Sequence, residues 1–255
     1  MSSSCIAAQL YTLRSQLRTP EEIAVTLPQV AKLGYRAVQL SALGPIETVE
    51  LKKILDAEGL EVCATHVSWE RLLTDLDGVV EEHELLGCSY VAVGSMPAEY
   101  RNVEGYARFA REASRVGARM KERGLTFGYH NHSFEFERVG AATGMEVLLA
   151  ESDAKSLAAE IDTYWIQHGG GDPAAWIRRC TGRIPAVHLK DMVIVGKEQR
   201  MAEVGEGNLN WPSILEACRD AGVRWYIVEQ DQTYDRSPLE SLGISLRNLK
   251  AMGLS

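Results

Sequence analysis

Short apolar runs and amphipathic segments alternate along the whole chain. Eight runs of four to six residues are rich in β-branched and aromatic side chains, which is typical of strands buried on both faces. The sequence predicts these strands at residues 5–10, 37–40, 61–65, 90–93, 126–129, 158–161, 184–189 and 225–228.

The segments between the runs carry helix start and stop signals. Thr19 and Pro20 supply an N-cap and a first-turn proline, and Gly34 follows the last apolar position of the same segment. The predicted helices cover residues 20–33, about 46–58, about 70–86, about 103–123, 143–151, 173–181, 211–221 and 238–252. Residues 192–210 show no clear element, and a long connection of this kind in a barrel usually belongs to the functional face.

Eight strand–helix units without a Pro/Ser-rich linker predict an α/β fold, a (β/α)8 TIM barrel formed by residues 1–255 as a single domain. The alternative is a doubly wound open sheet, which usually has a glycine-rich phosphate-binding turn after its first strand. Here the first strand is followed by Tyr11-Thr12-Leu13-Arg14. The barrel is therefore favoured.

Composition narrows the class of protein. The net charge is −8, from 27 basic and 35 acidic side chains, which argues against nucleic acid as a partner. No run of about 18 apolar residues is present, so we expect no membrane span. The N-terminal Met-Ser-Ser-Ser-Cys lacks the regions of a signal peptide, so we expect a cytoplasmic protein. A small-molecule substrate is the remaining expectation, and a homo-oligomer is left open.

Polar side chains gather where the predicted strands end. In a barrel the carboxyl ends of the strands meet at one mouth, and reactive groups come from several of them. Residues two apart on a strand share a face, which puts His130 and His132 on the same side, and the pairs on later strands behave alike. The strand-end residues are His66, His130, His132, Glu160, Asp162, His188, Lys190, Glu229 and Asp231.

This mixture of imidazoles and carboxylates predicts a divalent cation. Unpaired charges in a barrel mouth would cost several kcal/mol each on burial. Nitrogen and oxygen ligands together suit Mn²⁺, Zn²⁺, Co²⁺ or Fe²⁺ better than Ca²⁺. The scattered cysteines form no C-x-x-C pair, so a cysteine-ligated zinc site is not indicated.

Four motifs carry a resemblance to a known family. They are Gly128-Tyr129-His130-Asn131-His132, Ile161-Asp162-Thr163-Tyr164-Trp165, His188-Leu189-Lys190-Asp191 and Val204-Gly205-Glu206-Gly207. With them the chain resembles the sugar-phosphate isomerase/epimerase superfamily, which has the xylose-isomerase-like TIM barrel. The Gly-Tyr-His-Asn-His strand end is typical of one sub-branch, and the resemblance covers nearly the whole chain.

The resemblance implies one divalent metal, most often Mn²⁺, with Zn²⁺, Co²⁺ and Mg²⁺ as alternatives. It assigns Asp162, His188 and Glu229 as the ligands from strands six, seven and eight. Epimerase relatives have a glutamate on strand five, where this chain has Gly128. His130 is the expected substitute because it lies two residues on and points the same way.

Two other residues remain alternatives for the strand-five ligand, namely His132 and Glu135. A second departure affects the chemistry. Keto-sugar epimerases have a proton-moving histidine three residues after the strand-six aspartate, and this chain has Trp165 there.

The implied activity is that of a metal-dependent isomerase or epimerase acting on a keto sugar or polyol through a metal-stabilised enediolate. The expected catalytic residues are Glu229, Lys190 and His132. The expected substrate-binding residues are His66, Glu135, Trp165 and Glu206, the last of these as a lid residue in the long connection.

Several alternatives stay open from the sequence. A lyase or dehydratase acting on a 3-keto-glycoside or an inosose would use the same intermediate, and a non-catalytic member that binds sugar or metal is an alternative of another class. Lys190 next to Asp191 also fits an ordinary ion pair. A structural role is the alternative for His66, and a core role for Trp165.

Overall fold

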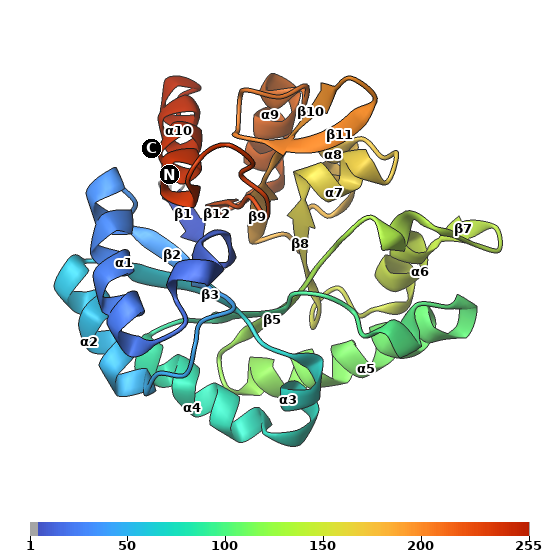
Figure 1. Cartoon of the computed structure of the whole chain (residues 1–255). Coiled ribbons are helices and arrows are strands. Elements are labelled where there is room, and N and C mark those ends of the chain that lie inside the picture. The colour runs from blue at the N-terminus through green and yellow to red at the C-terminus, as the bar shows by residue number, and fades with distance from the viewer. Residues whose placement is uncertain (1–4, 255) are drawn as a thin grey trace.

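A computed structural model describes residues 5–254. Residues 1–4, on which the expected absence of a leader sequence rests, lie outside this range. Eight parallel strands form a closed barrel in the order β1-β12-β9-β8-β5-β4-β3-β2, and helices surround it (Figure 1). The predicted fold class is confirmed. The strands are β1 (Cys5–Gln9), β2 (Ala37–Leu40), β3 (Glu61–His66), β4 (Tyr90–Val93), β5 (Thr126–His130), β8 (Ala158–Asp162), β9 (Ala186–Leu189) and β12 (Trp225–Val228).

The helices follow the predicted segments closely because their caps are explicit in the sequence. The Thr19 hydroxyl accepts from the Glu22 backbone N–H, and Gly34 ends the same helix at a left-handed φ of 108°. The helices are α1 (Pro20–Leu33), α2 (Thr48–Glu58), α3 (Trp69–Thr74), α4 (Leu76–Leu86), α5 (Val103–Glu122), α6 (Gly144–Glu151), α7 (Thr163–His168), α8 (Pro173–Arg179), α9 (Trp211–Ala221) and α10 (Pro238–Ala251). The short 3-10 helices are η1 (Leu10–Gln16), η2 (Ala98–Tyr100) and η3 (Phe134–Phe136). Within residues 5–254 no helix is long and apolar enough to cross a membrane.

Two predicted elements differ from the structure. The helix predicted over residues 70–86 is broken at Asp75, whose side chain caps the second piece by accepting from the Gly78 N–H. The connection 192–210 is not without structure. It contains an antiparallel hairpin, β10 (Asp191–Val195) with β11 (Glu198–Ala202), drawn in orange in Figure 1. A smaller hairpin pairs β6 (Arg138–Val139) with β7 (Ala142–Thr143).

Asp191 holds the long connection in place. Its buried carboxylate accepts hydrogen bonds from the Trp211 indole N–H and from four backbone N–H groups between residues 192 and 209. Asp191 is therefore a structural acceptor, and the alternative of an ion pair with Lys190 is wrong. Lys190 points the other way along the alternating backbone, into the barrel mouth.

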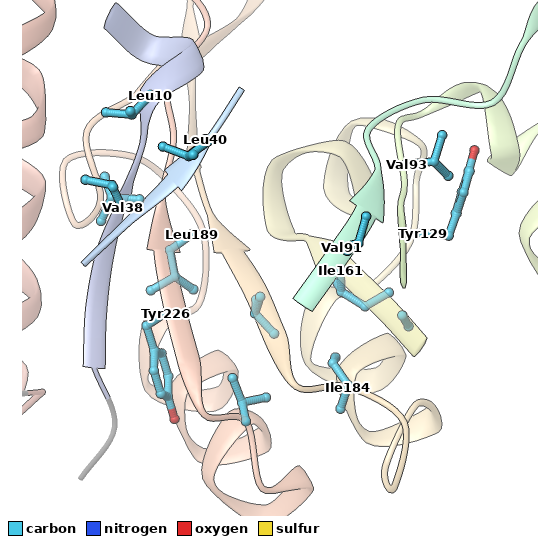
Figure 2. Close-up of a cluster of buried hydrophobic side chains, with 14 of the residues drawn as sticks. Leu10, Val38, Leu40, Val91, Val93, Tyr129, Ile161, Ile184, Leu189 and Tyr226 are labelled. Carbon is cyan, nitrogen blue, oxygen red and sulfur yellow. The ribbon is translucent and has the colours of Figure 1, made fainter. Parts of the chain in front are cut away.

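The core has two parts that follow the alternation of the strands. Outward-facing residues such as Leu40, Ile161 and Leu189 pack under the helices, and Figure 2 shows them on three of the strands. Inward-facing residues form a separate cluster inside the barrel, on the N-terminal side of the residues of the mouth. This inner cluster consists of Ala7, Ala37, Cys63, Ala64, Tyr90, Ala92, Ala158, Ala186, Trp225 and Ile227.

Candidate active site

Four buried side chains from consecutive barrel strands meet in the mouth. His130 ends β5, Asp162 ends β8, His188 lies on β9 and Glu229 follows β12. Each offers one ligand atom, and the four atoms lie within 4.8 Å of one another. The structure thus brings together the four residues predicted to hold a metal. We call them the quartet.

The spacing of the quartet fits one cation. His188 Nδ1 lies 2.9 Å from Glu229 Oε2, and His130 Nε2 lies 3.3 Å from Asp162 Oδ2. The longer separations are 3.9 Å from His130 to Glu229 and 4.0 Å from His188 to Asp162. Ligand atoms bound at about 2.0–2.2 Å to one ion are themselves about 3–3.5 Å apart. Two imidazole nitrogens and two carboxylate oxygens also match the preference of Mn²⁺, Zn²⁺ or Co²⁺.

Nearby carboxylates change the pKa of His130. Burial lowers the pKa of His130, but the hydrogen bond to Asp162 and the charges of Asp162, Glu229 and Glu160 outweigh it and raise the pKa to about 9. Its Nδ1 faces the Gly94 carbonyl at 3.1 Å and donates to it, which leaves Nε2 directed at the quartet. A cation bound there would displace the Nε2 proton, as metal binding to histidine generally does.

The interior of the barrel leaves little room for a side chain at position 128. A Cβ at position 128 would overlap the hydroxyl of Tyr90, which crosses the interior of the barrel at this level. A side chain at position 128 would require Tyr90 to shift. This contact disfavours a side chain at the position where the resemblance to epimerases implies a glutamate, and His130, two residues further on, lies in the mouth.

Lys190 is a fully buried ammonium beside the quartet. Its Nζ lies 2.8 Å from Glu229 Oε2, 3.1 Å from Asp162 Oδ2 and 3.0 Å from Asp231 Oδ2. Burial lowers the pKa of Lys190, but the three carboxylates outweigh it and raise the pKa well above its usual value. A lysine held in this way stays protonated at neutral pH, so it can donate hydrogen bonds or place positive charge near a substrate oxygen but is not available as a base.

A cavity of about 440 Å³ opens above the quartet. Four of the residues that line it have hydroxyl groups, namely Tyr11, Ser41, Ser68 and Ser95. Among the described residues that line it there is no arginine. The cavity also contains His66, His130, His132, Trp165, Lys190, Glu229 and Asp231.

His132 presents a free ring nitrogen. Its Nδ1 is buried and has no hydrogen-bond partner among residues 5–254. Burial, followed by the positive charges of His130 and Lys190, lowers the pKa of His132 to about 3, so the ring is neutral at pH 7. Its ring centre lies 5.3 Å from that of Trp165. A neutral imidazole has one unprotonated ring nitrogen and can accept a proton there.

Two residues predicted to bind substrate lie away from the cavity. Glu135 is completely buried behind the loop after β5, where it accepts from the Tyr129 hydroxyl at 2.5 Å and from the His132 backbone N–H at 2.9 Å. Glu206 is exposed and pairs with Arg236 at 2.6 Å. The structure places neither carboxylate against the cavity. Glu135 instead supports the backbone that carries His132.

Sequence reasoning assigned no role to two further residues, Glu160 and Gln39. Both are completely buried next to the quartet. Glu160 Oε2 lies 2.6 Å from His66 Nε2, and Gln39 Oε1 lies 2.6 Å from His188 Nε2. Glu160 shares the inward face of β8 with Asp162, and this alternation was the available signal. For Gln39 the only available signal was that it is a polar residue within an apolar run.

The fold and site agree with a known family. The chain belongs to the xylose isomerase-like TIM barrel family, whose family model matches residues 27–252. This is consistent with the superfamily resemblance seen in the motifs.

Named relatives are similar over most of the chain. The rhizopine catabolism protein MocC of Rhizobium meliloti is 26% identical over 89% of this chain and 80% of its own length. An inosose dehydratase of Bacillus cereus (strain AH820) is 21% identical over 81% of each chain.

Solved structures share the fold. A sugar phosphate isomerase/epimerase from Parabacteroides distasonis superposes with a TM-score of 0.82 at 24% identity, covering 100% of this chain and 96% of the other. An L-ribulose 3-epimerase superposes with a TM-score of 0.73 at 16% identity, covering 98% and 94% of the two chains. These solved structures show the shared fold, and the reaction is left to the residues of the site.

Proposed function

We propose that the protein is a metal-dependent dehydratase acting on an unphosphorylated keto polyol. His130, Asp162, His188 and Glu229 would hold the divalent cation, with Mn²⁺ as the preferred ion. When bound, the cation supplies a Lewis acid that polarises a carbonyl oxygen and stabilises negative charge on it. The remaining chemistry comes from side chains of the cavity.

Trp165 is the observation that carries the choice of reaction. It lines the cavity where keto-sugar epimerases have a proton-moving histidine. Epimerisation returns a proton to the opposite face of the same carbon and therefore needs proton carriers on both faces. Elimination of water on one face needs a single carrier. An indole cannot exchange a proton with carbon at neutral pH, so Trp165 favours elimination.

His132 is the proposed proton carrier. A ring nitrogen of His132, which lines the cavity, takes a proton from the carbon next to the carbonyl, and the electron pair of the broken C–H bond forms a carbon–carbon double bond. The β-hydroxyl leaves with the same proton, now returned by His132, and the products are an unsaturated ketone and one water. Lys190 faces the site as a fixed positive charge, and Glu229 is the other candidate base because it combines a carboxylate with a place in the quartet.

The substrate class follows from the lining of the cavity. The hydroxyl-bearing residues of the lining suit a polyol, since a hydroxyl group can donate to and accept from a substrate hydroxyl. The buried ammonium of Lys190 already faces three carboxylates. A phosphate would need arginine or free backbone N–H groups, so an unphosphorylated substrate is favoured. The inosose dehydratases among the relatives act on a substrate of this kind by name.

The proposal is tested with Mn²⁺-reconstituted protein in D₂O and a panel of inososes, ketohexoses and 3-keto-glycosides. NMR and mass spectrometry follow the loss of water and the uptake of deuterium at carbon. A dehydratase gives an unsaturated product that has lost one water. Full recovery of every substrate without carbon-bound deuterium would contradict the proposal and favour a member that binds without turnover.

Isomerisation or epimerisation is the second candidate, because His66 also reaches the cavity. His66 and His132 flank His130, with ring centres 5.2 and 5.0 Å from it. Two histidines could carry protons to different carbons or faces. Deuterium bound to carbon in a product that has not lost water would indicate isomerisation or epimerisation rather than elimination.

A further inference from the structure

A chain of hydrogen bonds leaves the quartet on the inner side of His188. His188 Nε2 lies 2.6 Å from Gln39 Oε1, and Gln39 Nε2 lies 2.9 Å from Glu160 Oε1. The second oxygen of Glu160 lies 2.6 Å from His66 Nε2. The members come from four different strands, β2, β3, β8 and β9, and Gln39, Glu160 and His188 are completely buried.

The direction of each hydrogen bond in this chain can be deduced. An ionised carboxylate only accepts, so the amide nitrogen of Gln39 must be the end that faces Glu160. The amide oxygen of Gln39 then faces His188. Because that oxygen also only accepts, His188 must carry its proton on Nε2.

This placement decides which atom His188 offers to the quartet. When a cation occupies the quartet and the proton is held on Nε2, Nδ1 is the ring nitrogen that can give its lone pair to the cation. Nδ1 is the atom that faces Glu229 Oε2 at 2.9 Å within the quartet. The opposite tautomer would direct an N–H at the cation site and could not bind a metal there.

His66 closes the other end of the chain. Its Nε2 donates to Glu160 Oε2, so both oxygens of the carboxylate have a donor. The ring of His66 stacks on that of His188, with ring centres 5.5 Å apart and planes 16° apart. A rotation of the Glu160 carboxylate would break two short hydrogen bonds, which makes Glu160 the fixed point of the chain.

We propose that Glu160 and Gln39 are positioning residues that fix the proton of His188 on Nε2 and thereby keep Nδ1 available to a divalent cation. This inference rests on the proposed function only in assigning a cation to the quartet. The position of the proton on His188 is a property of the protein itself. Outer hydrogen bonds of this kind typically change metal affinity by about 10–100-fold when they are removed.

The first test replaces Gln39 with methionine, which keeps the length of the side chain and removes both hydrogen bonds. We expect Q39M to bind Zn²⁺ or Co²⁺ about 10–100-fold more weakly in a competition with a chelator. Gln9 offers a matched control. It is a buried glutamine paired with Gln39 in the β1–β2 register, and its oxygen accepts from the Tyr11 backbone N–H. Q9M should leave the affinity within about twofold of the wild type, as expected outside the chain of hydrogen bonds.

The second test reads the proton directly. ¹⁵N NMR of histidine-labelled protein distinguishes a protonated ring nitrogen from one with a free or metal-bound lone pair, and only six histidines must be assigned. In the Zn²⁺-loaded wild type, Nε2 of His188 should carry the proton and Nδ1 should be metal-bound. In Q39M the protection of the Nε2 proton from exchange with solvent should be lost.

The outcomes separate this inference from the proposed function. If Q39M binds metal as tightly as the wild type, or if His188 carries its proton on Nδ1, the positioning role is refuted while the enzymatic proposal stands. If the spectra show the Nε2 proton but no substrate of the panel reacts, the positioning role stands and the dehydratase proposal fails. E160Q supplies a second variant, since its amide donates to Gln39 or to His66 and should disturb the proton of one of the two histidines.

Discussion

The inner faces of the barrel strands differ sharply between their beginnings and their ends. Ala37, Tyr90, Ala158, Ala186 and Trp225 are the first residues of their strands, and they belong to an apolar cluster. The ends of the strands carry the buried histidines and carboxylates of the mouth. The inward-facing side chains thus form an apolar cluster, which we call the plug, near the starts of the strands. At the ends of the strands they form the candidate metal ligands.

The two levels are stabilised by different forces. In the lower level, small side chains leave room for two large rings, and the free energy comes from burial and close packing. In the mouth, burial of charges opposes folding and is offset by hydrogen bonds and opposite charges. Substitutions in the plug should therefore change stability with little effect on chemistry, and substitutions in the mouth should do the reverse.

Asp162→Asn should give the largest effect on function. The asparagine oxygen can still cap α7, where Asp162 Oδ1 accepts from the Trp165 N–H at 3.0 Å, so the fold should persist. The charge of the ligand is lost. We expect metal affinity to fall by at least about a hundredfold and turnover with it, because loss of a direct ligand should exceed the 10–100-fold effect of outer contacts. Elemental analysis and thermal unfolding measure the two properties. Retention of one metal per chain would mean that Asp162 is not a ligand.

Trp225→Ala should give the largest effect on stability. Trp225 is 6% exposed within the plug, and removal of its ring leaves a cavity. The expected loss is about 3–5 kcal/mol in the free energy of unfolding, measured with urea. Metal bound per folded chain should stay unchanged. The exposed Val25→Ala serves as a control, with an expected change within about 0.5 kcal/mol. A stable W225A that has lost its metal would erase the distinction between the two levels.

The fold was predictable because strand and helix signals are local. The apolar runs and the caps at Thr19 and Gly34 lie within single segments of the chain. The break at Asp75 was missed because the amphipathic period continues across it, and only the side-chain cap on Gly78 interrupts the helix. The hairpin of residues 191–202 was missed although Gly196, at a φ of 64°, provides its turn.

The candidate site was predictable only in part for the same reason. Alternation along single strands was enough to group His130, Asp162 and His188 at the mouth. The role of Glu160 depends on Gln39, which lies 121 positions away in sequence and on a strand across the barrel. The opposite error concerns Glu135, which was expected to bind substrate and is buried against Tyr129 and the His132 backbone instead. Pairings between distant strands and the direction of a loop side chain are decided by the closed barrel and by packing.

The buried carboxyl of Glu135 should make the free energy of unfolding depend on pH. Burial raises the pKa of Glu135 from 4.5 to about 7, although hydrogen bonds from Tyr129 and His132 oppose the shift. Below pH 4.5 the carboxyl is protonated in both the folded and the unfolded state, and its contribution to stability is fully present. Between pH 4.5 and 7 the unfolded state ionises first, so this contribution is lost as pH rises. Urea unfolding of the wild type should lose up to about 3 kcal/mol over this range relative to E135Q. Parallel pH profiles would show that Glu135 is already ionised in the folded protein.

Gly128→Ala tests the boundary between the plug and the mouth. The new methyl group would overlap the Tyr90 hydroxyl, so Tyr90 must shift within the packed interior. We expect a loss of about 1–3 kcal/mol in the free energy of unfolding. Tyr90→Phe should recover part of this loss, because its hydroxyl has no hydrogen-bond partner among the described residues. An unchanged urea midpoint in G128A would mean that the interior accommodates a side chain here and that sterics do not exclude a strand-five ligand.

Glu206→Gln should have the smallest effect and sets the outer limit of the site. Glu206 is exposed and shares Arg236 with Glu203, so removal of one surface charge should cost about 0–1 kcal/mol. Because its carboxylate lies outside the cavity, kcat/KM should stay within about twofold of the wild type, as for surface substitutions in general. E203Q is the matched comparison, since Glu203 is 6% exposed and also accepts from the Ser241 hydroxyl, so its loss should lower stability more. A tenfold fall in kcat/KM for E206Q, with the unfolding midpoint unchanged, would show that this carboxylate closes over the substrate and that the mouth extends into the long connection after β9.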